Sequence, residues 1–95
     1  MKRGKRIIDH VVHGMDLDME AIPGRPFVEI VEDCRVIVEN HYGISVYQNE
    51  RIYVAVNYGE IQVTGDRLSV VQMTKSRIVI AGVIHCVQLC KRGHT

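Results

Sequence analysis

The sequence lacks several features that mark whole classes of protein. It contains no tryptophan, one phenylalanine, two prolines and three cysteines in 95 residues. The odd, small cysteine count and the absence of a secretory signal argue against a disulfide framework and predict a reducing, cytoplasmic location. No apolar run approaches the roughly 20 residues of a membrane-spanning helix. Valine, isoleucine, leucine and phenylalanine make up about a third of the chain, which excludes disorder and predicts one soluble, compact domain.

The charge is balanced overall but unevenly distributed. The formal net charge is +1, yet basic residues gather at the two ends of the chain. Between residues 7 and 90 lie six basic and all eleven acidic residues, so the body carries a net charge of −5. The body therefore offers nucleic acid little attraction, and a small nucleic-acid-binding β-barrel is the least favoured alternative. Either the basic start stays solvated, or it contacts phosphate, from lipid or nucleic acid.

Residues 1–22 are predicted to form a basic N-terminal segment with a short helix and an acidic connector. Apolar residues follow helical spacing over residues 5–15. A peripheral membrane contact through this segment is one alternative function, because basic and apolar side chains together bind anionic lipid surfaces. Its candidate residues are Lys2, Arg3, Lys5, Arg6, Ile7, Ile8, Val11 and Val12.

Residues 23–90 are predicted to form an all-β domain, followed by a basic tail at 91–95. Valine and isoleucine dominate this region, and β-branched residues favour strands over helices. Apolar residues alternate with others, as in Ile52, Val54 and Val56, and turn signals such as Gly43, Gly59 and Gly65 recur about every eight residues. The expected fold is a single antiparallel domain of seven or eight short strands, a sandwich or rolled barrel, preceded by the short helix.

A second set of apolar side chains falls on the strand face opposite the main apolar set. Such a face needs a cover, which the N-terminal helix, a second sheet layer or another subunit could supply. We expect that replacing Tyr53 or Val79 with serine weakens association and leaves the fold intact. The candidate interaction face consists of Tyr47, Tyr53, Ala55, Val71 and Val79.

No sequence pattern for catalysis, a metal or a cofactor is found. The serines lie outside a Gly-x-Ser-x-Gly elbow, and the glycines are single rather than grouped as in phosphate-binding loops. His10 with His13, and His85 with Cys86 and Cys90, do not match paired metal-ligand motifs. The sequence therefore predicts a protein that is not an enzyme and holds neither metal nor cofactor.

Three segments in order carry a resemblance to a known family. They are Val38–Ile44 with Glu-Asn-His-x-Gly-Ile, Asn57–Leu68 with Gly-Glu-Ile-x-Val-Thr-Gly-x-x-Leu, and Ile78–Ile84. Together they resemble the YabP/YqfC family of bacterial sporulation proteins, the YqfC branch more than the YabP branch, over about residues 16–89.

The resemblance implies a non-enzymatic protein made in the mother cell during endospore formation, with no catalytic residues to transfer. Our leading hypothesis is a structural or assembly factor that acts through protein–protein contacts, in the mother-cell cytoplasm or at the forespore envelope. Its expected partners are a spore-envelope or membrane protein, or a second copy of the chain. The resemblance further implies turns at Gly43, Gly59, Gly65 and Gly82, and core positions at Ile44, Ile61, Val63, Leu68, Ile80 and Ile84.

Overall fold

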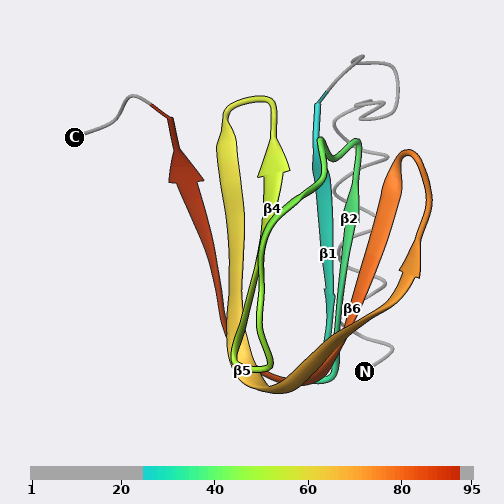
Figure 1. Ribbon diagram of the computed structural model, residues 1–95, viewed down its shortest axis with the longest axis vertical. Coiled ribbons are helices and arrows are strands. Elements are labelled where there is room, and N and C mark those ends of the chain that lie inside the picture. Colours follow the sequence, from blue (N-terminus) through green and yellow to red (C-terminus); the bar gives the residue numbers. More distant parts are fainter. Residues whose placement is uncertain (1–24, 93–95) are drawn as a thin grey trace, which may run out of the picture.

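The computed structural model describes residues 25–92, which form one antiparallel six-stranded sheet (Figure 1). The sheet order is β1-β2-β6-β5-β4-β3. This confirms the predicted antiparallel all-β fold, whereas the helix predicted over residues 5–15 lies outside the described residues. The strands are β1 (Phe27–Val31), β2 (Arg35–Glu39), β3 (Ile44–Tyr47), β4 (Arg51–Val56), β5 (Gly59–Met73) and β6 (Arg77–Lys91).

Two strands, β5 and β6, are much longer than the others and bend together at the bottom of Figure 1. Their bend divides the sheet into two arms. The β4 arm contains β3, β4, residues 59–64 of β5 and residues 86–91 of β6. The β2 arm contains β1, β2, residues 77–81 of β6 and residues 69–73 of β5. Both arms therefore share the same two long strands.

The expected seven or eight short strands are six because two expected breaks are bends inside continuous strands. Gly65 was predicted to lie in a turn, but it lies within β5, opposite Ile84. Gly82 similarly lies within β6, with φ +140°, a backbone conformation that side chains disfavour. Since the two strands stay paired through the bend, a glycine that reads as a turn in sequence serves as a bend in the sheet.

Close backbone contact explains why glycine occupies both bend positions. A Cβ on Gly65 would collide with the backbone carbonyl of Val83, and one on Gly82 would approach the carbonyl oxygen of Arg67 to 2.6 Å. The β3–β4 turn and the β1–β2 turn also form hydrogen bonds with the bend. Leu68 N–H donates to the carbonyl of Asn49 at 2.8 Å, and Ile84 N–H donates to that of Asp33 at 2.7 Å. The bend is thus fixed from both sides by backbone hydrogen bonds.

The hydrophobic core lies between the arms. In β4, buried Ile52, Val54 and Val56 alternate with less buried residues, as expected for a strand with one solvent-facing side. The expected core positions Ile61, Val63, Leu68, Ile80 and Ile84 are buried, and Ile44 packs against them from the edge. The fully assembled cluster is Val36, Val38, Ile52, Val54, Val56, Ile61, Val63, Leu68, Ile78, Ile80 and Ile84.

Candidate interaction surfaces

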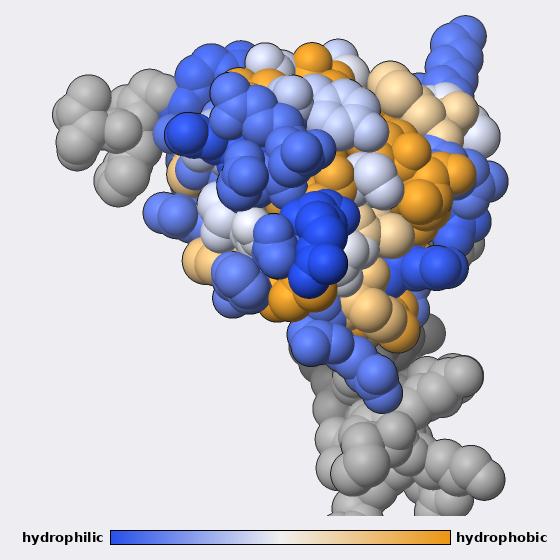
Figure 2. All heavy atoms as spheres, turned by 60° about the horizontal axis from the view of Figure 1, so that its bottom comes forward, coloured by the Kyte–Doolittle hydropathy of each residue, from blue (hydrophilic) through white to orange (hydrophobic). Residues whose placement is uncertain are grey.

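The five residues of the predicted interaction face do not lie on one surface. Tyr53 and Ala55 lie on the outer face of the β4 arm, opposite Gln62 and Glu60 of β5, and both are half-buried. Val71 and Val79 belong to the β2 arm. Figure 2, which brings the bent end forward, likewise shows several separate apolar areas with polar side chains between them. The fold therefore divides the predicted face into at least two surfaces.

Within the β2 arm, Val71 and Val79 have different environments. Val71 lies where the register between β5 and β6 shifts, and its side chain is exposed. Val79 is opposite Ile37 of β2, and these two side chains are 4% and 9% exposed. Val79 and Ile37 both lie outside the central core cluster. Val79 is therefore a buried residue, which removes it from the accessible interaction surface.

Tyr47 links the two arms. It lies at the end of β3, opposite Ile52, on the side of the sheet that faces the core. Its hydroxyl oxygen accepts a hydrogen bond from the backbone N–H of Val70 at 3.0 Å. The phenol thereby connects the edge of the β4 arm with the edge of the β2 arm, and its contribution is structural.

The predicted membrane-contacting residues, from Lys2 to Val12, lie outside the described residues. Within residues 25–92, no helix is long and apolar enough to cross a membrane. The same part of the chain contains no cluster of three or more histidine, cysteine or acidic side chains that could hold a metal ion. Cys34, Cys86 and Cys90 are free thiols.

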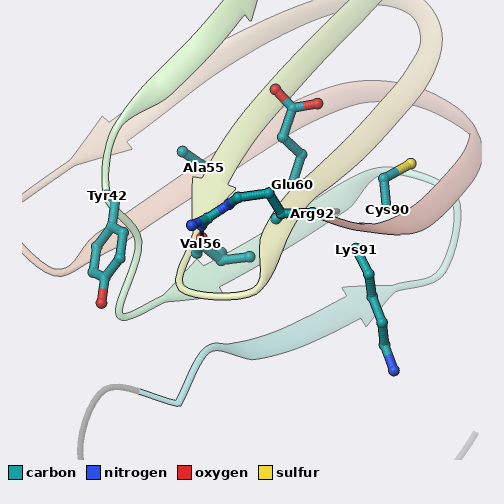
Figure 3. Close-up of a pocket in the computed structure, with 8 residues that line it drawn as sticks. Tyr42, Ala55, Val56, Glu60, Cys90, Lys91 and Arg92 are labelled. Atoms are coloured by element: carbon teal, nitrogen blue, oxygen red, sulfur yellow. Dashed lines mark hydrogen bonds between the residues drawn. The ribbon is translucent and has the colours of Figure 1, made fainter. Parts of the chain in front are cut away.

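A shallow hollow of about 400 Å³ lies at the open end of the β4 arm (Figure 3). The side chain of Arg92 extends across the hollow, and its guanidinium donates hydrogen bonds to the carbonyls of Val56 and Asn57 at 3.4 and 3.0 Å. Its backbone N–H also donates to the carbonyl of Tyr58 at 2.6 Å. Arg92 thus holds the β4–β5 turn against the end of β6 and is engaged with the protein's own backbone.

Glu60 lines this hollow, and its carboxylate accepts two side-chain hydrogen bonds. Its Oε2 accepts a hydrogen bond from the Ser45 hydroxyl at 2.7 Å, and its Oε1 accepts one from the Gln62 amide at 3.1 Å. Both bonds favour the charged form, so they lower the pKa of Glu60, the Ser45 bond most. The pair also connects β3 to β5 across β4.

Asn40 and His41, in the Glu-Asn-His-x-Gly-Ile segment, both make hydrogen bonds that hold the fold together. The Asn40 amide donates to the carbonyl of Arg25 at 2.7 Å. The backbone N–H of Gly43 donates to His41 Nδ1 at 2.9 Å, so Nδ1 is unprotonated and Nε2 carries the hydrogen. Nε2 then donates to the carbonyl of Thr74, also at 2.9 Å. The neutral imidazole ties the β2–β3 connection to the β5–β6 turn.

Free strand edges form a further candidate surface of the sheet. Beyond the bend, residues 86–91 of β6 pair with β5 on one side, and none of the described strands pairs with them on the other. The sequence does not reveal this run as one edge, because the turn expected at Gly82 separates the apolar residues on its two sides. The available signal was the absence of any charged residue or proline from Val83 to Cys90, since exposed edges usually carry such residues.

Comparison with known proteins adds the family. The family model described as the YabP family matches residues 24–94. The chain belongs to the YabP family. The match covers the whole described sheet and confirms the resemblance based on the three segments, and the closer resemblance to the YqfC branch stays a prediction. No curated protein and no solved structure shows a significant match to the chain.

Proposed function

We propose that this YabP-family chain is a non-enzymatic assembly protein of endospore formation that acts through protein–protein contacts. The family is associated with sporulation, which supports the process. The observation that carries the mode of action is the free β6 edge beside half-exposed apolar side chains such as Leu89. Unpaired strand edges with apolar side chains are a common docking surface for another strand.

The proposed location is the mother-cell cytoplasm, with recruitment to the forespore envelope through a protein partner. A fluorescent fusion followed through sporulation of the source organism tests this proposal. Signal that traces the forespore envelope, together with reduced spore yield in a deletion strain, is the expected result. Absence of the protein from sporulating cells, or a deletion with normal spore yield, contradicts it.

A membrane-adaptor function remains the second candidate because of the basic and apolar residues from Lys2 to Val12. Flotation of the full chain with anionic vesicles tests it. A variant with Lys2, Arg3, Lys5 and Arg6 replaced by glutamine is the matched control, because it removes the charge and keeps the apolar residues. Flotation that this variant loses favours the adaptor; no flotation of the parent chain excludes it.

A further inference from the structure

The described sheet has four free edge segments, and three of them carry features that discourage pairing. β1 has Glu29 at its centre. β3 is four residues long and contains a register shift. The end of β5 also contains a shift, and its Val70 N–H is already bonded to the Tyr47 hydroxyl. Charges, bulges and short length are the ordinary protections of an edge.

The fourth edge, residues 86–91 of β6, is the least protected, since its one charged residue, Lys91, lies at its end. No register shift interrupts its pairing with β5 from Cys86 to Lys91. Its interior from Cys86 to Cys90 has no charged residue and no proline. Leu89 lies opposite the buried Ile61, on the core side of the sheet, yet it is 58% exposed. Figure 1 shows this end of β6 as the outermost strand of its arm.

The hydrogen bonds show which residues point their backbone groups outward. Arg92 N–H donates to the carbonyl of Tyr58, so these two residues form a hydrogen-bonded pair of the antiparallel ladder. Hydrogen-bonded and non-hydrogen-bonded pairs alternate along such a ladder. Cys86, Gln88 and Cys90 therefore direct their backbone groups to β5. Val87, Leu89 and Lys91 direct theirs to the free side.

We propose that two copies of the chain pair through this edge, antiparallel, about a two-fold axis at Gln88. Val87 then lies opposite Leu89 of the second copy, and both present outward N–H and C=O groups, as a hydrogen-bonded pair requires. His85 lies opposite Lys91, and no two acidic or two permanently charged basic residues are opposed. The half-exposed leucine gains an apolar neighbour. This inference rests on the proposed mode of action and names the partner as a second copy.

The register makes a specific prediction for the thiols. Cys86 lies opposite Cys90 of the second copy in a non-hydrogen-bonded pair, where Cα atoms are about 4.5 Å apart. That separation is within the range that a disulfide spans. Within one copy, the same two residues are four positions apart on one strand, about 13 Å, and cannot be joined. A shift of the register by two residues places Cys86 opposite Gln88 or Arg92 and separates the thiols.

Mild oxidation with diamide tests the register in the full chain carrying Cys34→Ser, which leaves Cys86 and Cys90 as the only thiols. Each disulfide releases two electrons and two protons to the diamide. The expected product is a covalent dimer whose digest contains peptides joined between Cys86 and Cys90. A monomer without cross-links, or bonds joining Cys86 to Cys86 or Cys90 to Cys90, overturns the register.

Light scattering under reducing conditions tests the dimer itself. The parent chain is expected at twice its monomer mass, and Leu89→Lys is expected to raise the dimer Kd at least about tenfold, because pairing would bury an unpaired ammonium group. Met73→Lys is the matched control: Met73 is 53% exposed and opposes the core residue Ile78 on the β5 edge of the other arm. Equal weakening by both variants, or a parent chain that stays monomeric, overturns the proposal.

These outcomes are independent of the proposed function. If the parent chain is monomeric in solution but its deletion lowers spore yield, the sporulation role stands and only the second copy is rejected. If the dimer forms but the protein is absent from sporulating cells, the dimer stands and the proposed function fails.

Discussion

The two arms of the sheet share β5 and β6, yet their residues are buried differently. In the β4 arm, β4 alternates between buried and half-buried positions, so one face packs on the core and the other meets solvent. In the β2 arm, three consecutive residues are buried in β2, Val36–Val38, and three in β6, Ile78–Ile80. A strand buried on both faces has a continuous apolar run rather than an alternating one. The same sheet thus contains one arm that is buried on one face and one arm whose central strands are buried on both faces.

Substitutions at the bend between the arms are expected to lower the free energy of unfolding most. Gly65→Ala introduces a methyl group against the Val83 carbonyl, and the bend must open to admit it. We expect a loss of at least about 3 kcal/mol in the free energy of unfolding, measured in urea by circular dichroism. Gly43→Ala is the control, because Gly43 has φ +113° but no atom near the added methyl. Its expected cost is about 1–2 kcal/mol; equal costs for the two variants contradict the clash.

The outer faces of the two arms are expected to respond differently to serine substitutions. Val79→Ser removes buried methyl groups and buries a hydroxyl, so we expect a loss of about 2–3 kcal/mol. Tyr53→Ser changes a half-buried position on the outer face of the β4 arm and is expected to cost about 1 kcal/mol. Urea unfolding of both variants measures the difference. A Val79→Ser variant as stable as the parent would show that the two outer faces are alike.

The connection that leads from one arm to the other depends on His41. His41→Ala removes a hydrogen bond to the Thr74 carbonyl and one from the Gly43 N–H, both at a part-buried site. The expected loss is about 1–3 kcal/mol in the free energy of unfolding. His85→Ala, at an exposed position, is the control and is expected to change stability by less than about 0.5 kcal/mol. Equal effects would mean that the imidazole does not hold the connection.

The smallest expected effect is the pH dependence contributed by Glu60 in the β4 arm. Hydrogen bonds from Ser45 and Gln62 lower its folded-state pKa below the usual value of 4.5. A lowered folded pKa stabilises the fold above the unfolded pKa, and this contribution is lost as the pH falls through the folded pKa. Unfolding between pH 7 and pH 3 should therefore show a weaker acid dependence in Ser45→Ala. Ser69→Ala, an exposed serine of the β2 arm, should retain the parent dependence.

The sequence predicted burial most accurately where a strand has one face on the core and the other in solvent. The alternation of Ile52, Val54 and Val56 predicted a one-sided strand, and all three are buried. The prediction was least accurate at Gly65 and Gly82, because glycine is equally suited to a turn and to a bend between closely paired strands. It also grouped Tyr47 with Tyr53, since strand periodicity cannot show that a register shift in β3 separates their sides.

The sequence by itself determined the all-β class, the antiparallel pairing through short turns and most of the core, because β-branched composition and apolar period act locally along the chain. Only the tertiary structure decided that β5 and β6 continue through a shared bend. It alone buried Val79 beside Ile37 and left residues 86–91 of β6 with one partner among the described strands. These features depend on which strands become neighbours, and neighbours distant in sequence are set by packing and hydrogen bonds that no local pattern records.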